Sequence, residues 1–188
     1  MFTIIMKSTQ KKQRVGADER REQILAAALT EFSEKGLHGG STVNIAQAVG
    51  ISHPNVFRLY PTKIDLFTAV LEQAFATVAK TMLATGETTK DEPLQAMANA
   101  WGILMEDREL MLILLQGYAA SADPVIRELM QGWTRDVFER MEALPSVGTD
   151  LAHDFFAAGM LYMVSASMDL PAQVDKADWV KRFLESGR

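Results

Sequence analysis

The segment STVNIAQAVGISHPNVFRLYPTK, residues 41–63, decides the fold because it predicts two short helices joined by a tight turn. Thr42 is the expected N-cap of the first helix. The apolar side of this helix would consist of Val43, Ile45, Ala46 and Val49. Gly50 follows, and glycine enters a left-handed turn at little cost. Ser52 suits the N-cap of the second helix, and Pro54 falls in its first turn, where a missing N–H is harmless.

The second predicted helix has an inward and an outward side. Val56 and Tyr60 are four residues apart and can face the core together. The outward side is then left to His53, Asn55, Phe57 and Arg58. Arg58 can donate two bonds to guanine O6 and N7, and Asn55 can pair with adenine N6 and N7. A helix-turn-helix places the start of its second helix in the major groove, so we expect this side to bind double-stranded DNA.

Residues 18–75 resemble the DNA-binding domain of the tetracycline-repressor (TetR-type) family of bacterial transcriptional regulators. The matching features follow one another in order along the chain. They are an amphipathic helix ERREQILAAALTEFSEKG, a helix capped at Thr42, the turn GIS, the helix HPNVFRLY, and PTKIDLF opening a long fourth helix. The resemblance covers about a third of the chain, and the remainder carries no recognisable motif.

The resemblance implies which residues contact DNA, partly through bases and partly through phosphates. The expected set is Thr42, Ser52, His53, Pro54, Asn55, Phe57, Arg58 and Lys63. Lys63 also lies at a helix N-terminus, whose free N–H groups attract anions. This chain departs from the family at Phe57, where tyrosine is usual, and at Leu59, where histidine or tyrosine is frequent. Either side chain could instead belong to the core, and Ser52 or a basic tail could replace the missing phosphate contacts.

The charge of the chain is divided between its two parts. The net charge is −5 at pH 7, yet residues 1–80 hold ten Lys and Arg against seven Asp and Glu. Residues 81–188 hold nine against seventeen. The basic groups therefore accompany the helix-turn-helix, as expected of a protein that presents one end to DNA. Within them, Lys7, Lys11, Lys12 and Arg14 form a tail that is either a DNA contact or a solubilising terminus.

The composition is that of a globular protein, with 48% hydrophobic and 23% charged residues and no cysteine. We expect a cytoplasmic location in a bacterium, on the nucleoid when DNA is bound. The apolar run at residues 110–115 is far too short to cross a bilayer. The first six residues lack the order of a secretion signal.

The apolar periodicity is helical nearly throughout, which predicts an all-α fold. We expect a flexible tail at 1–17, a three-helix helix-turn-helix DNA-binding domain at 18–75, and a helical effector-binding and dimerisation domain at 76–188. The segment LHGGS, residues 37–41, predicts a loop. Helices after the recognition helix are predicted at 62–84, 93–106, 108–120, 124–143, 149–169 and 176–186.

The C-terminal part is rich in methionine and aromatic residues. Methionine fills irregular space and repacks easily, which suits a pocket for apolar ligands, although any helical core needs such residues too. The resemblance implies a small, largely apolar effector among the helices at 62–143. The candidate pocket residues are Met97, Trp101, Met105, Leu115, Tyr118, Met130 and Trp133.

The helix at 149–169 is dense in small residues and apolar on more than one face. Small residues let two helices approach closely, and with the helix at 176–186 it resembles the dimerisation helices of the family. The candidate interface residues are Phe155, Phe156, Gly159, Tyr162, Met163, Trp179 and Phe183. A two-fold dimer would place two recognition helices ~34–36 Å apart on a palindrome.

These observations favour a homodimeric, ligand-responsive transcriptional regulator, most simply a repressor. We expect neither catalysis nor a cofactor or metal, because the three histidines lack metal-ligand spacing and no glycine-rich phosphate loop follows a strand. The alternative is a helical dimer that binds a ligand or a protein without specific DNA. The operator, the regulated genes and the effector are not encoded in any residue pattern.

Overall fold

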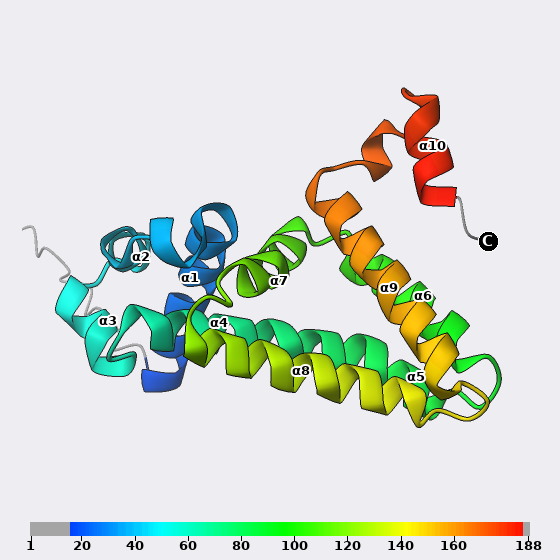
Figure 1. Cartoon of the computed structure of the whole chain (residues 1–188). Coiled ribbons are helices and arrows are strands. Elements are labelled where there is room, and N and C mark those ends of the chain that lie inside the picture. The colour runs from blue at the N-terminus through cyan, green and yellow to red at the C-terminus, as the bar shows by residue number, and fades with distance from the viewer. Residues whose placement is uncertain (1–15, 186–188) are drawn as a thin grey trace, which may run out of the picture.

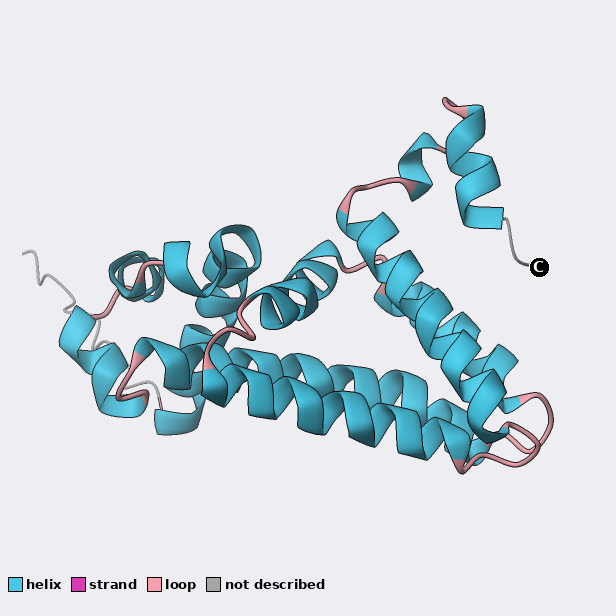
Figure 2. Ribbon diagram, in the orientation of Figure 1, coloured by secondary structure: helices cyan, strands magenta, loops and turns pink. Residues whose placement is uncertain are grey.

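The computed structural model describes residues 16–185, and within them every regular element is a helix (Figure 2). The prediction of an all-α fold is confirmed. The tail lysines and Arg14 lie outside the described residues. The α-helices are α1 (Ala17–Gly39), α2 (Thr42–Val49), α3 (His53–Leu59), α4 (Lys63–Val78), α5 (Ala84–Thr88), α6 (Pro93–Leu104), α7 (Arg108–Ala119), α8 (Pro124–Glu142), α9 (Gly148–Ser167) and α10 (Asp178–Glu185).

Helices α1, α2 and α3 gather around the start of α4 at one end of the molecule, and α10 lies at the other end (Figure 1). The buried side chains Phe32 of α1 and Phe67 of α4 meet edge to face, with ring centroids 5.1 Å apart. Ile45 of α2 and Val56 of α3 belong to the same core. Each short helix is therefore held by burying its apolar side, because helices of this length are not stable alone.

The turn between α2 and α3 forms as predicted at Gly50, which has φ 70° and ψ 36°. The N-cap of α2 was placed one residue too late: Ser41, not Thr42, accepts the bond from the Asn44 N–H. Val43 does not join the apolar side either. Because Val43 stands two residues before the buried Ile45, it lies about 200° around the helix and faces solvent.

The end of α1 also differs from the prediction. Gly36 has φ 66° and ψ −177°, which interrupts the helix where we expected it to end. The chain then makes a further turn to Gly39 instead of entering a loop, and Leu37 of this turn is buried. The Gly40 N–H donates to the Gly36 carbonyl at 3.0 Å. Because Leu37 is buried in this turn, the first part of the segment LHGGS is helical and not a loop.

A long rod crosses the molecule beside α8 (Figure 1). It consists of α4, the π-helical segment η1 (Ala79–Leu83) and α5. Thr62 and Asp65 start the rod with a reciprocal capping box, at the residue where the fourth helix was predicted to begin. The predicted helix 62–84 is thus extended by one turn, to Thr88. The π turn was not predicted, because a single widened turn leaves the apolar spacing of the sequence almost unchanged.

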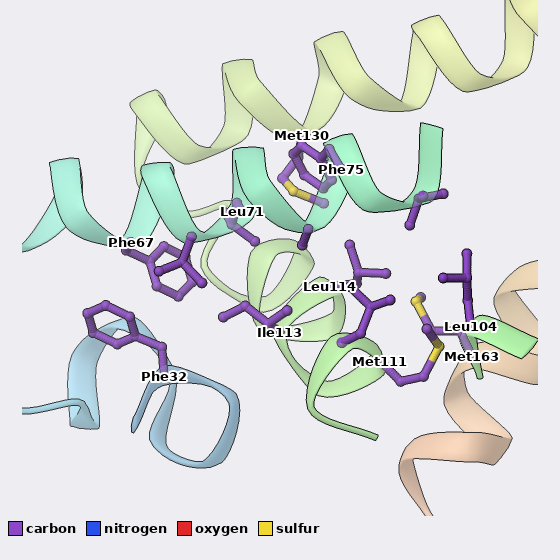
Figure 3. Close-up of a cluster of buried hydrophobic side chains, with 14 of the residues drawn as sticks. Phe32, Phe67, Leu71, Phe75, Leu104, Met111, Ile113, Leu114, Met130 and Met163 are labelled. Carbon is purple, nitrogen blue, oxygen red and sulfur yellow. The ribbon is translucent and has the colours of Figure 1, made fainter. Parts of the chain in front are cut away.

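One buried cluster runs along this rod from α1 to α9 (Figure 3). It begins at Phe32 and continues through Leu71 and Phe75 of α4 and Leu114 of α7 to Met163 of α9. Helix α7 packs against both α1 and α9, so it joins the two ends of the cluster. The N-terminal helices and the C-terminal helices therefore share one core.

Candidate nucleic-acid interface and ligand pocket

The outward side of α3 forms as the helical periodicity required. Val56 is buried, whereas Pro54, Asn55 and Arg58 are exposed and His53 is half-buried. Ser52 precedes the helix at the N-cap position, but its hydroxyl accepts from the Asn55 side-chain amide at 2.9 Å instead of capping the backbone. The Arg58 guanidinium, the second N–H of the Asn55 amide and the Ser52 hydroxyl hydrogen can therefore meet a polar surface.

Thr42 and His53 link the two helices of the motif. The Thr42 hydroxyl and His53 Nε2 share a hydrogen bond of 2.8 Å. The His53 ring also meets Phe57 edge to face, with centroids 4.8 Å apart. Phe57 is half-buried against this ring, whereas Leu59 packs against the core. Thr42, His53 and Phe57, three of the expected contact residues, therefore hold one another in place, while Arg58 stays exposed.

Lys63 lies at the first position of α4, next to the N-cap Thr62. Its ammonium group donates to the His38 carbonyl at 3.0 Å, so it spans from α4 to the end of α1. A lysine held over a helix N-terminus can offer its remaining N–H donors to a phosphate. This geometry suits a contact with the phosphate backbone of a nucleic acid, next to the exposed side of α3.

Glu31 of α1 fixes the start of α2, a role that the sequence pattern did not reveal. Its carboxylate accepts from the Ser41 N–H at 2.9 Å and from the Asn44 amide at 3.2 Å, and it pairs with Lys35 at 2.8 Å. Partial burial raises the pKa of Glu31, but these hydrogen bonds outweigh that effect and hold the pKa below its ordinary value of 4.5. Helix α2 is thereby anchored to α1 through a charged acceptor.

An apolar cavity of about 40 Å³ lies between the rod, α6, α8 and α9. Among the described residues, its lining carries no charged side chain. Trp101 and Trp133 line it as predicted, and the other lining residues are Val78, Met82, Val137, Met141, Phe155, Phe156, Gly159 and Met160. Trp133 also stacks on Phe75 at 4.3 Å, which gives the pocket an aromatic wall.

The remaining pocket candidates lie elsewhere. Met97 is fully buried, and Leu115 packs against the core. Tyr118 and Met130 line an open cleft of about 530 Å³ beside the pocket, and the two spaces share Phe156. Met105 borders two further clefts, one of which lies between α6 and α9 and shares Trp101, Phe155 and Gly159 with the pocket. The sequence could not separate these positions because every one of them is apolar and helical.

The candidate interface residues of α9 and α10 divide into two groups. Phe155, Phe156 and Gly159 line the pocket, and Met163 is buried within its own chain, so its side chain is not available to a second copy. The Tyr162 hydroxyl donates to the Leu184 carbonyl at 2.9 Å and ties α10 to α9. Apolar side chains left exposed on these helices and their connection are Leu151, Leu161, Val164, Met168, Trp179 and Phe183.

Comparison with known proteins identifies the N-terminal part of the chain. Residues 24–70 match the family model "Bacterial regulatory proteins, tetR family". The HTH-type transcriptional regulator RutR of Escherichia coli is 38% identical over 68 residues, which cover 36% of this chain and 32% of RutR. The chain thus matches about a third of the length of this curated relative.

Solved structures share the fold of nearly the whole chain. A TetR-like transcriptional regulator from Rhodococcus sp. RHA1 has a TM-score of 0.68 at 21% identity and covers 93% of this chain and 100% of its own. The transcriptional regulator FadR from Bacillus subtilis, solved with stearoyl-CoA, has a TM-score of 0.64 at 15% identity and covers 86% and 92%. Within residues 16–185, no helix is long and apolar enough to cross a membrane.

Proposed function

We propose that this chain, which belongs to the tetR family of bacterial regulatory proteins, is a ligand-responsive repressor that binds a palindromic operator as a homodimer. A small, largely apolar effector would release it from the DNA. Residues 18–75 would bind DNA, and residues 76–188 would bind the effector and a second copy. The observation that carries this proposal is the exposed polar side of α3, presented at one end of a rigid core. We place the protein in the bacterial cytoplasm, on the nucleoid when bound.

Base reading is assigned to the exposed part of α3. Arg58 and Asn55 are the side chains that can make paired hydrogen bonds to a base edge in the major groove. Pro54 adds apolar surface that fits a thymine methyl group. Thr42 and His53 are already bonded to each other, so we assign them and Ser52 to phosphates at the groove edge.

Dimerisation is assigned to the apolar side chains that α9 and α10 leave exposed. Val164, Met168 and Trp179 are among the large hydrophobic residues facing solvent in one chain. Contiguous exposed apolar surface of this kind favours association. A two-fold axis through α9 and α10 would carry the paired α3 helices, at the opposite end of each chain, to two half-sites of one operator.

Effector release is assigned to a movement of the rod. Val78 and Met82 line the pocket, and the same rod begins beside α3. A ligand that displaces these side chains would shift the start of α4 and the spacing between the two α3 helices. A coupling of ~1–3 kcal/mol between the two sites gives a 5- to 150-fold change in affinity. FadR, which shares the fold, was solved with a ligand that carries a long apolar chain.

Selection of bound fragments from the source genome tests this function. We expect the full chain to retain a small set of fragments that share an inverted repeat, in the presence of excess bulk DNA. Uniform retention of all fragments would instead favour the alternative, a helical dimer that binds a ligand or a protein without reading DNA.

A further inference from the structure

Two residues that line the pocket between the rod and α9 carry a buried hydrogen-bond donor without a protein partner. The indole Nε1–H groups of Trp101 and Trp133 are buried, and no acceptor among the described residues bonds to either. A buried donor without a partner costs free energy, so such groups are uncommon in folded proteins. Both residues line one small apolar pocket, so a ligand that widens this pocket could supply the missing acceptor.

Trp101 faces a space that its neighbour leaves open. Its side chain is only 8% exposed, and Nε1 lies 3.8 Å from the position that a Cβ would take at Gly159. Gly159 lines the same pocket from α9. Because glycine has no side chain, no Cβ stands beside this donor, and a ligand that widens the pocket at Gly159 could bring an acceptor atom to it.

The charge of the pocket wall limits the ligand further. No charged side chain of the described residues lines the pocket, so a charged ligand would lose its hydration without gaining a counter-ion. Two arginines border the neighbouring cleft. Arg127 donates to the Ser121 and Ala122 carbonyls, whereas Arg135 is exposed there. An acidic ligand would have to reach that cleft, and the pocket itself favours a neutral one.

We propose that the effector is a neutral molecule with an aromatic or other apolar body and a carbonyl-type acceptor oxygen, and that the Trp101 indole N–H donates to this oxygen. The Trp133 ring, which Phe75 supports by stacking on it, provides a flat wall for the body. That this ligand acts as an effector depends on the regulatory function proposed above. The binding chemistry itself depends only on the pocket.

The pocket must widen to accept such a molecule. A cavity of about 40 Å³ is far smaller than the ~300 Å³ typical of ligand sites. Met82, Met141 and Met160 line it, and methionine side chains change rotamer easily. Met82 lies in the π segment of the rod, so the widening required by the ligand acts directly on the helix that begins beside α3.

The test uses the full-length protein and two probes of nearly equal shape. Acetophenone carries a carbonyl oxygen, and α-methylstyrene carries a CH₂ group in its place. The indole N–H resonances of 15N-labelled protein report on Trp101, while Trp179, 53% exposed on α10, serves as an internal reference. We expect acetophenone to move the Trp101 resonance downfield and to bind about threefold to tenfold more tightly than α-methylstyrene.

Two variants separate the hydrogen bond from the shape of the pocket. Trp101→Phe removes the donor, so both probes should bind equally. Gly159→Ala places a methyl group at ordinary contact distance, 3.8 Å, from Nε1, and should remove the preference for acetophenone while Trp101 itself is retained. This second variant keeps the test decisive if Trp101→Phe fails to fold.

Several results would overturn the proposal. They are equal affinity of the two probes for the wild-type protein, no binding of acetophenone at its solubility limit, or a preference that survives Trp101→Phe. Benzoate binding more tightly than acetophenone would also overturn it, and would assign the ligand to the cleft at Arg135. None of these measurements involves DNA. If the protein selects no DNA fragment but shows the expected probe binding, the proposed regulatory function is wrong and the proposed ligand chemistry still holds.

Discussion

Arg58 is the residue on which the proposed recognition of the DNA sequence most depends. It is exposed on α3, four residues after Pro54 and on the opposite side from the buried Val56. Arg58→Ala should cost ~1–3 kcal/mol of operator binding and relax the preference at one base pair. Binding titrations against operators with single base changes measure this. Arg135→Ala, which removes an exposed arginine of α8, is the matched control and should leave both quantities unchanged.

Lys63 should behave differently, because a phosphate contact carries no sequence information. Lys63→Ala should weaken binding to every DNA sequence and reduce the slope of log K against log salt by about one. Lys80→Ala, an exposed lysine in the π segment, provides the control. An unchanged slope in the Lys63 variant would remove this residue from the interface.

The lowered pKa of Glu31 predicts that the stability of the fold depends on pH. Because the folded pKa of Glu31 lies below its ordinary value of 4.5, the carboxylate stabilises the fold above that pH, and this contribution is lost as the pH falls through the folded pKa. Glu31→Gln should therefore destabilise the protein by about 1 kcal/mol at pH 7. Urea unfolding should show the difference from wild type shrinking below pH 4.5. A constant difference would contradict the role of the charge.

Among the contacts between helices, the one between α1 and α7 is the hardest to foresee from the sequence. Gly36 occupies a backbone region that is almost restricted to glycine, and a Cβ there would lie 2.5 Å from Gln116 Oε1 of α7. The Gln116 amide in turn donates to the Ser33 carbonyl at 3.5 Å. The end of α1 is thus shaped to receive α7.

Gly36→Ala should lower the free energy of unfolding by ~1–3 kcal/mol, because the new side chain is strained and crowds Gln116. Gly39→Ala is the matched control: its Cβ would meet only Lys35 at 3.4 Å, and its φ is not in the left-handed region. Thermal unfolding of the two variants compares them directly. Equal melting temperatures would show that the fit between α1 and α7 is not required.

Sequence patterns specified the elements well and their mutual arrangement poorly. Apolar periodicity, Gly50 and the cap at Thr62 located the helices to within a few residues. The N-cap shift from Thr42 to Ser41 arose because two adjacent hydroxyl residues are equally good caps in sequence. The pocket could not be located, because Met97 in the core and Met82 in the pocket wall have the same chemistry. Which methionine meets which helix is decided by tertiary packing.

For the whole molecule, the proposed dimerisation is the feature that would link the proposed ligand domain to a palindromic operator. Val164→Glu introduces a charge on the exposed apolar side of α9, where Val164 is 37% exposed. We expect this variant to sediment as a monomer and to lose most of its operator affinity, because one α3 helix then binds alone. Val125→Glu, at an exposed apolar residue of α8, should remain a dimer. A dimeric Val164→Glu protein would place the interface elsewhere.

Protection of guanine N7 from methylation on the selected operator tests the central claim most directly, because N7 lies in the major groove. If the exposed side of α3 reads DNA in each half of a dimer, the protein should protect two groups of guanines about 10 base pairs apart, or a multiple of that, on one face of the duplex. Arg58→Ala should remove protection at one guanine in each group. If the protein binds the operator while every guanine N7 remains open to methylation, the exposed side of α3 does not read the major groove.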